Sequence, residues 1–334
     1  MDFFLELRIY FVIQGYYIIM ENKKLKIAIA SGKGGVGKSM LTSALAMLFV
    51  QDKKKIIAVD CDVDAPNLAV WLGDPEHWKK VKKISVSEKP VINNNIKLSK
   101  KEAQQCSEKC RFNALEVRKG KLKLNPFLCE GCGACEIFCP KGVIKMKPVK
   151  NGEIKLKKIY FVKISKSGTA NQQFDRARYS FPLISGQLFP GETGSGKVVS
   201  ELKAQAEKFD GNTMLIDSAP GTGCPVIASL QDSDFAVLIT EPTPSGFSDL
   251  NRVLEVVEHF KLNWGLVINK WDINKSLTKR MEKKFKNNLI GRISYDKNIF
   301  KAIANLTPIL KTDLRVKKEI ENIYNKLKKY INSN

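Results

Sequence analysis

Two groups of residues in this 334-residue chain have the types and spacing that chemistry requires. The first is a glycine-rich run with two lysines and a serine: Gly32, Lys33, Gly34, Gly35, Val36, Gly37, Lys38 and Ser39. Glycines let backbone N–H groups turn inward around a polyphosphate, and a following helix N-terminus adds partial positive charge. Lys38 would then neutralise the β- and γ-phosphates while the Ser39 hydroxyl binds Mg²⁺. The run therefore predicts a phosphate-binding loop.

The context of this loop supports the prediction. An apolar run, 25–30, precedes it as a strand would, and 41–50 follows it as a helix would. Glycine-rich turns before helices are common without any nucleotide, but eight matched positions in this context favour nucleotide binding. A second run, Gly191 to Lys197, also fits the spacing, yet Val198 stands where the Mg²⁺-binding hydroxyl should be. We interpret that run as the start of a helix at 197–209.

The loop resembles that of the MinD-like, deviant Walker A ATPases, which include the nitrogenase iron protein and the ParA and Mrp families. In that family the early lysine, here Lys33, reaches across a dimer interface to the nucleotide of the partner. The resemblance implies an ATPase with ATP and Mg²⁺ as ligands, Lys33 and Lys38 as catalytic residues, and a homodimer.

Two acidic segments resemble the switches of the same family. In 59–68 the resemblance assigns Asp62 to orienting the attacking water and places Asp60 near the magnesium shell. In 215–221 it assigns Asp217 to holding Mg²⁺ through water. Either Asp60 or Asp217 alone could simply end a strand, but together with the loop the functional interpretation is favoured.

A further strand-like run, 264–269, ends in Asn-Lys-x-Asp. This motif selects guanine in the GTPase branch of phosphate-loop proteins. The two loop lysines favour the ATPase branch, in which the resemblance gives only Asn269 a role at the base. We expect ATP, with GTP as the alternative.

The second group of residues comprises cysteines at ferredoxin spacing. The chain has Cys129, Cys132, Cys135 and Cys139-Pro140, the bacterial cluster-binding run, with glycines between the first three that let the chain wrap a cluster closely. This spacing favours a 4Fe–4S cluster over structural disulfides, and nothing indicates an oxidising compartment, so we expect a cytoplasmic protein. A zinc site is the alternative.

An upstream run is incomplete. Cys106 and Cys110 match its last two positions, whereas Lys100 and Ala103 stand at the first two. In two-cluster ferredoxins the fourth cysteine of each run binds the other cluster. We therefore expect one 4Fe–4S cluster per chain, with Cys106 left over beside Cys139 as the residual ligands of a lost second cluster. A labile or intersubunit cluster on those two is the alternative. The expected ligands of the retained cluster are Cys110, Cys129, Cys132 and Cys135.

The net charge of +22 is distributed unevenly. Residues 76–160 carry 19 Lys and 2 Arg against 8 Glu and no Asp, a net charge of +13. Such a field would favour an acidic redox partner or client protein. Nucleic acid is a weaker candidate, because the excess is lysine without a recognised binding motif. A lysine-rich surface with no specific partner explains the charge equally well.

The elements that must position these residues follow an alternating pattern. Strand-like runs at 24–30, 56–60, 213–217, 235–240, 264–269 and 289–293 alternate with helical stretches. This order predicts an α/β fold, a mostly parallel sheet with helices on both faces. We expect a MinD-like domain of 20–80 and 149–334, and an inserted α+β ferredoxin domain at 84–148.

Two further segments are less informative. A hairpin is expected within 153–164, and a lysine-rich amphipathic helix at 315–330 without the stripe needed for membrane targeting. Residues 1–19 lack the features of a signal peptide, and we interpret them as an extension from a start site assigned too early, or as a membrane-surface helix. No stable membrane insertion is expected.

These expectations leave two main functions. In the first, a nucleotide-dependent dimer gates electron transfer through the cluster. In the second, the protein is an ATP-dependent carrier or scaffold that delivers a cluster or another cofactor. Four firm thiolates favour the first, and a partition or positioning ATPase is the weakest candidate because it gives the cluster no role.

Overall fold

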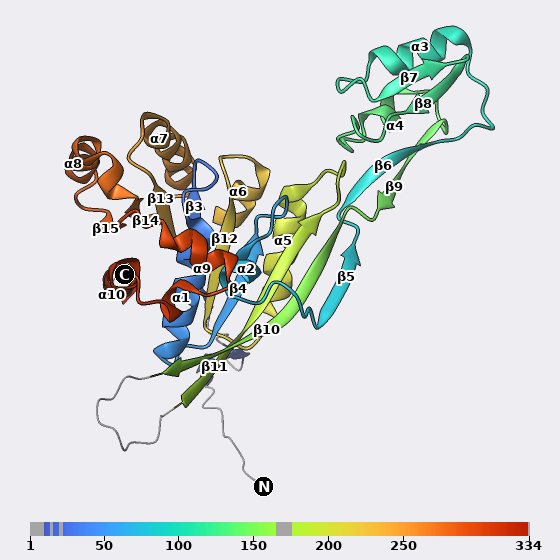
Figure 1. Cartoon of the computed structure of the whole chain (residues 1–334). Helices are drawn as coiled ribbons and strands as arrows, with labels where there is room; N and C mark the ends of the chain where they lie inside the picture. The colour runs from blue at the N-terminus through green and yellow to red at the C-terminus, as the bar shows by residue number, and fades with distance from the viewer. Residues whose placement is uncertain (1–9, 14–15, 20–22, 165–175, 333–334) are drawn as a thin grey trace, which may run out of the picture.

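The structure is a computed structural model that describes residues 10–13, 16–19, 23–164 and 176–332. Its centre is a nine-stranded sheet (Figure 1). From β15 to β11 neighbouring strands run parallel, whereas β10 is antiparallel to both β11 and β5. The strands follow the order β15 (Leu289–Ile293), β14 (Asn263–Asn269), β13 (Phe235–Thr240), β3 (Leu25–Ser31), β12 (Thr213–Pro220), β4 (Ile56–Cys61), β11 (Arg176–Leu188), β10 (Gly152–Ile164) and β5 (Lys80–Ile84).

Helices cover both faces of this sheet because its strands are apolar on both sides. In β3, Ile27 and Ile29 enter one core and Ala28 and Ala30 the other, since successive side chains alternate between faces. The first core is covered by α1 (Lys38–Gln51), α2 (Leu68–Trp71), α9 (Asn298–Ala304), η2 (Ile309–Lys311) and α10 (Arg315–Asn332). The second is covered by α5 (Ser195–Glu207), α6 (Cys224–Leu230), α7 (Pro244–His259), η1 (Trp271–Ile273) and α8 (Lys275–Lys284). The predicted α/β architecture is confirmed.

The expected hairpin within 153–164 is wrong. Gly152–Ile164 forms the single strand β10, which pairs along its whole length with β11. The physical reason is visible in the sequence, because 153–164 contains no Gly, Pro, Asn or Asp that would turn the chain. The connection between the two strands, 165–175, lies outside the described residues.

A small α+β module, which we call the insert (residues 87–149), leaves the sheet between β5 and β10. Figure 1 shows it standing away from the helices that cover the sheet. Three of its cysteines, Cys106, Cys135 and Cys139, contribute to an apolar core of its own, together with Leu115, Leu122, Val143 and Ile144. The insert consists of two antiparallel pairs, β6 (Ser87–Ile92) with β9 (Ile144–Val149) and β7 (Leu115–Arg118) with β8 (Lys121–Leu124), and the helices α3 (Lys100–Glu108) and α4 (Ala134–Phe138).

The first residues of the chain are described only in part. β1 (Tyr10–Ile13) and β2 (Tyr16–Ile19) form an antiparallel pair, so the alternative of a membrane-surface helix is wrong for these residues. The remainder of 1–19, and with it the interpretation of the start site, lies outside the described residues. Within the part of the chain that the structure describes, no helix is both long and apolar enough to span a bilayer.

Candidate nucleotide site and cysteine cavity

The glycine-rich loop connects the end of β3 to the start of α1. Gly35 and Gly37 have positive φ angles of 76° and 97°, and Gly37 is the N-cap of the helix. A Cβ on Gly32 would lie 2.1 Å from the Asp249 carbonyl oxygen, and one on Gly37 would lie 2.7 Å from the Asn269 amide nitrogen. The loop therefore needs glycine both for its backbone angles and for close packing. Lys38, the first residue of α1, is buried.

Two predicted magnesium residues lie side by side at the carboxyl end of the sheet. Asp60 of β4 and Asp217 of β12 are register partners, and they are 1% and 0% exposed. Thr42 Oγ1 donates to Asp217 Oδ1 at 3.1 Å, and the Leu68 amide donates to Asp60 Oδ2 at 3.0 Å. Asp217 Oδ2 is buried and has no hydrogen-bond partner among the described residues. Adjacent buried carboxylates with an unsatisfied oxygen fit a hydrated divalent cation such as Mg²⁺.

The electrostatics of these acids reflect their burial. Burial raises the pKa of Asp217 to about 6, against the lowering effect of the Lys38 ammonium. Burial and the Asp217 charge raise the pKa of Asp60 well above its usual range. Asp62 is half-buried beyond the end of β4, and burial raises its pKa while Lys38 again opposes the rise. The structure therefore brings together Lys38, Asp60, Asp62 and Asp217, four of the residues that the sequence predicted.

Lys33 is held by a residue that the sequence analysis did not identify. Its ammonium lies 3.9 Å from Glu241 Oε2, and Lys270 Nζ lies 2.5 Å from Glu241 Oε1. Glu241 directly follows β13, and its side chain is only 10% exposed. Its position directly after an apolar strand, which Asp62 shares, is the signal that could have found it. Lys33 itself remains 38% exposed, unlike the buried Lys38.

Asn269 lies against the loop from the end of β14. Its side-chain amide donates to the Val36 carbonyl oxygen at 2.8 Å, so it supports the loop directly. The aspartate of the same motif, Asp272, accepts a hydrogen bond from the Tyr295 amide at 2.8 Å. A role of Asn269 at the nucleotide base stays a prediction.

Four thiols of the insert line a single cavity. These are Cys110, Cys129, Cys132 and Cys135. Other residues that line the cavity include Lys109, Arg111, Phe112, Leu115, Leu124 and Phe138. Cys129 and Cys135 are buried, Cys110 is half-buried, and Cys132 is exposed. Within the described ranges, no three acidic, cysteine or histidine side chains are arranged to bind a single metal ion. The thiols are thus distributed around the cavity instead of meeting at one point.

The backbone of the insert allows this arrangement. Gly131 and Gly133 take positive φ angles of 65° and 77°, and Gly133 is the N-cap of α4. Burial raises the pKa of the Cys129 thiol, although the Gly131 amide and the Lys89 ammonium act in the opposite direction. Burial, together with the neighbouring thiols, raises the pKa of Cys135 to about 11.

Cys106 and Cys139 correct an expectation. They were expected to remain as ligands of a lost second cluster, but the structure joins them in a disulfide with Cα atoms 5.4 Å apart. Both lie in the apolar core of the insert. The chain folds α3 and the end of α4 against each other, which brings two residues 33 positions apart into contact.

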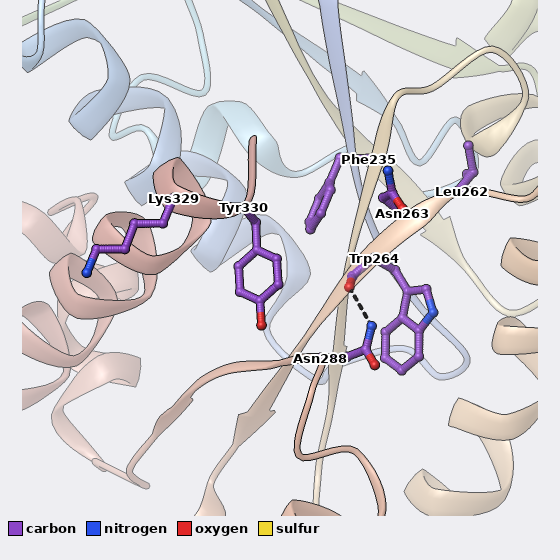
Figure 2. Close-up of a pocket in the computed structure, with 7 residues that line it drawn as sticks. All are labelled: Phe235, Leu262, Asn263, Trp264, Asn288, Lys329 and Tyr330. Carbon is purple, nitrogen blue, oxygen red and sulfur yellow. Dashed lines mark hydrogen bonds between the residues drawn. The ribbon is translucent and has the colours of Figure 1, made fainter. Parts of the chain in front are cut away.

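A cavity of about 490 Å³ lies elsewhere, and Figure 2 shows the side chains that line it. Phe235 and Asn263 begin β13 and β14, so the cavity lies at the amino ends of these strands, whereas the phosphate loop follows the carboxyl end of β3. Asn288 Nδ2 donates to the Trp264 carbonyl oxygen at 3.0 Å across it. None of the predicted site residues lines this cavity, so it is separate from the nucleotide site.

Comparisons with known proteins agree with this geometry. Residues 27–309 match the CobQ/CobB/MinD/ParA nucleotide binding domain. The uncharacterised protein MJ0578 of Methanocaldococcus jannaschii is 36% identical over 308 residues, which are 92% of this chain and 98% of that protein. An iron-sulfur cluster carrier protein of Saccharolobus solfataricus is 46% identical over 54 residues, only 16% of this chain and 18% of that protein.

Solved structures show the same fold. The cell division ATPase MinD of Pyrococcus furiosus superposes with a TM-score of 0.52 at 17% sequence identity, covering 92% of this chain and 99% of that one. The loop, the paired acids and the parallel sheet are thus accompanied by a family match over most of the chain. The chain belongs to the CobQ/CobB/MinD/ParA family of nucleotide-binding domains.

Proposed function

We propose that two copies of this protein close around ATP and Mg²⁺ and thereby gate electron transfer through a 4Fe–4S cluster held in the insert. One observation carries the proposal: four thiols from two separate cysteine runs line one cavity in a module attached to an ATPase core. An ATPase alone would not need such a cavity, and a simple ferredoxin would not need the ATPase.

The nucleotide half of the proposal uses the buried charges at the carboxyl end of the sheet. The loop amides and Lys38 hold the phosphates, while Ser39, Asp60 and Asp217 hold hydrated Mg²⁺. Asp62 orients the water. The oxygen of this water forms a bond to the γ-phosphorus while the bond between that phosphorus and the oxygen bridging it to the β-phosphorus breaks. The products are ADP and inorganic phosphate.

The dimer in the proposal follows from Lys33. Lys38 is buried in its own loop, whereas Lys33 is 38% exposed and pairs with Glu241 only at 3.9 Å. A partly exposed ion pair at this distance stabilises little, at most about 1 kcal/mol. Lys33 is therefore available to leave Glu241 and reach the phosphates bound by a partner subunit.

The residues of the cysteine cavity fit a 4Fe–4S cluster, with Cys110, Cys129, Cys132 and Cys135 as ligands. When bound there, the cluster would supply one-electron transfer from a reduced donor protein to an acceptor protein. The buried Cys129 and Cys135 keep water from one side of the cavity, while Cys132 faces solvent. An acceptor would approach from the side of Cys132.

The mouth of the cavity suits an acidic acceptor. Two cations, Lys109 and Arg111, and one carboxylate, Glu130, line the cavity, so its charged lining is positive on balance, and Phe112 beside them is 37% exposed. An apolar ring flanked by positive charges matches a partner whose own cofactor is surrounded by carboxylates. The rate of such docking should fall as the salt concentration rises.

Delivery of a cluster to a client is the second candidate. The partial similarity to a protein named as an iron-sulfur cluster carrier favours it. Against it, two of the four thiols are buried, and a cluster enclosed in this way is harder to release. A homodimer and ATP control are common to both candidates.

One experiment separates the candidates. The protein is reconstituted anaerobically with iron and sulfide, reduced with dithionite, freed of excess reductant, and mixed with ATP, Mg²⁺ and either an oxidised acidic ferredoxin or its apo form. Reduction of the oxidised ferredoxin without loss of iron from the chain supports electron transfer. Iron and sulfide appearing in the apo form would support the carrier instead, and a chain that binds no iron would contradict both.

Lys33→Ala serves as the control for ATP dependence. This variant should keep its cluster but lose both hydrolysis and ATP-dependent electron transfer, because it lacks the group that reaches across the dimer. Retained electron transfer with ATP in Lys33→Ala would show that nucleotide does not gate the cluster.

A further inference from the structure

A buried polar contact ties the insert to the ATPase core. The Lys89 side chain, 7% exposed, lies 3.0 Å from Glu192 between Nζ and Oε2. The same ammonium donates to the Pro126 carbonyl oxygen at 3.0 Å and to the Gly191 carbonyl oxygen at 3.1 Å. Lys89 belongs to β6 of the insert, whereas Glu192 and Gly191 precede α5 of the core. This one side chain therefore bridges the two parts.

Further contacts connect the same part of the core to the insert and to the loop that carries Cys129 and Cys132, here called the cysteine loop. Asn151 is fully buried; its Oδ1 accepts from the Val86 amide at 3.0 Å, and its Nδ2 donates to the Thr193 carbonyl oxygen at 2.9 Å. Gly131 lies between Cys129 and Cys132 of the cavity. A Cβ there would lie 2.4 Å from the Glu88 carbonyl oxygen and 3.8 Å from Thr193 Oγ1. The cysteine loop thus rests directly on the junction.

On its other side, α5 is held to the second switch. It packs against α6 and β11 (Figure 1), and α6 begins three residues after the switch ends at Gly221. A Cβ on Gly196 of α5 would lie 3.0 Å from the Cys224 carbonyl oxygen, so the two helices touch at their starts. At the far end of α6, Lys203 Nζ of α5 donates to the Ala228 carbonyl oxygen at 2.8 Å. The two helices are therefore in contact at both ends of α6.

We propose that Lys89 and Glu192 are positioning residues that couple the nucleotide state of the core to the charge around the cysteine cavity. The inference rests on the proposed function. Movement of the second switch carries α6, then α5, and with α5 the carboxylate of Glu192. The Lys89 ammonium donates a hydrogen bond to the carbonyl oxygen of Pro126, three residues before Cys129, and acts electrostatically on the Cys129 thiol. Any change in how far Glu192 neutralises Lys89 therefore changes the field in the cavity.

The sign of the effect follows from charge. Reduction adds one electron to the cavity, so the positive charge of Lys89 favours the reduced state and the negative charge of Glu192 opposes it. Cluster potentials respond to net charge and to hydrogen bonds beyond the ligands themselves. Separating Glu192 from Lys89 should raise the potential, and bringing them together should lower it.

The test compares Glu192→Gln with Glu201→Gln. Both change one carboxylate of the same region to an amide, but Glu201 accepts its hydrogen bond from Gln205 within α5. The midpoint potential of each reconstituted protein is measured by titration with dithionite followed by electron paramagnetic resonance, without nucleotide and with a non-hydrolysable ATP analogue plus Mg²⁺. Iron content and the ATP hydrolysis rate without acceptor are measured in parallel.

We expect the wild type and Glu201→Gln to change potential when the analogue binds. Glu192→Gln should start from a higher potential and lose most of that change, with iron content and hydrolysis unaltered. Lys89→Arg, which keeps the positive charge, should retain the change, and it provides a second measurement if loss of the Glu192 charge disturbs folding.

Three outcomes would overturn the inference. A wild type that carries a cluster and binds the analogue without any change of potential would remove the coupling and leave the proposed function standing. An undiminished change in Glu192→Gln would show that these residues do not carry it. A wild type that binds no cluster would remove the proposed function, and the inference with it.

Discussion

At the scale of single residues, the Glu241 carboxylate forms ion pairs beside the phosphate loop. It lies between two ammonium groups, 3.9 Å from that of Lys33 and 2.5 Å from that of Lys270. On the opposite side of the loop, Asp60 and Asp217 stand in register with one oxygen unsatisfied. The free chain therefore satisfies Lys33 and leaves the carboxylates ready for a cation.

Glu241→Gln should make the exposed lysine easier to transfer to the partner subunit. Because the pair with Lys33 is partly exposed, its loss should lower the free-energy barrier of hydrolysis by at most about 1 kcal/mol. The rate of ATP hydrolysis should therefore rise by up to roughly fivefold. Steady-state hydrolysis at saturating ATP and Mg²⁺ measures the change. A fall in the rate of Glu241→Gln toward that of Lys33→Ala would mean that Glu241 is needed to position the lysine instead.

Cys110→Ser and Cys139→Ser distinguish the two cysteine sets. Reconstituted wild type should bind about four irons per chain. Cys110→Ser should lose most of the cluster signal in the electron paramagnetic resonance spectrum, because it removes a thiol from the cavity. Cys139→Ser should keep its iron, since Cys139 is bonded to Cys106 outside that cavity. If Cys139→Ser lost its iron and Cys110→Ser kept it, the fourth ligand of the cluster would be Cys139 instead of Cys110.

At the scale of elements, α5 and α6 are joined by packing and by hydrogen bonds from one side chain. Lys203 of α5 is buried, and it donates to carbonyl oxygens near the end of α6, including those of Ala228 and Gln231. Burial lowers the pKa of Lys203, because the charged ammonium is destabilised when it is removed from water. These bonds satisfy backbone groups that the end of a helix leaves without partners.

Lys203→Met should therefore destabilise the core despite its apolar surroundings. Leaving the carbonyl oxygens at the end of α6 unpaired costs about 1–3 kcal/mol, partly offset by removal of the buried charge. Urea unfolding followed by circular dichroism measures this loss. Lys197→Met, an exposed position of the same helix, should change stability by no more than about 0.5 kcal/mol. Equal stabilities of the two variants would contradict the role of Lys203.

At the scale of the whole molecule, the sheet carries its two functional parts at different places. The phosphate loop and acids lie where the central strands β3, β4 and β12 end, whereas the insert leaves between the edge strands β5 and β10. Figure 1 shows the insert projecting beyond the sheet, away from the helices. The phosphate loop and the cysteine cavity therefore lie in separate parts of the molecule.

ATP-dependent dimerisation should follow from this arrangement. The 37.5 kDa chain should sediment as a dimer with a non-hydrolysable ATP analogue, and Asp62→Ala should do so with ATP itself, because the water is no longer oriented. Lys33→Ala should remain a monomer under both conditions. Analytical ultracentrifugation measures these states, and a Lys33→Ala dimer of wild-type stability would contradict a role of that lysine across the interface.

Much of the architecture could be predicted because it is written in consecutive residues. Apolar runs such as 235–240 and 289–293 became strands with those same bounds, β13 and β15. The phosphate loop and the two switch segments are also short continuous motifs, so their residues could be identified before their positions were known. The hairpin expected within 153–164 was wrong, because the segment has no residue that would turn the chain and instead pairs along its length with β11 as the single strand β10.

By itself, the sequence determined six strands of the sheet, the phosphate loop and the cysteines available for a cluster, since each depends on neighbouring residues. Only the tertiary structure decided which side chains meet. It joined Cys106 to Cys139, placed Glu241 between two lysines, and set Lys89 of the insert against Glu192 of the core. The physical reason is that these contacts form between residues far apart in the chain, and no local preference specifies which of many partners becomes the neighbour.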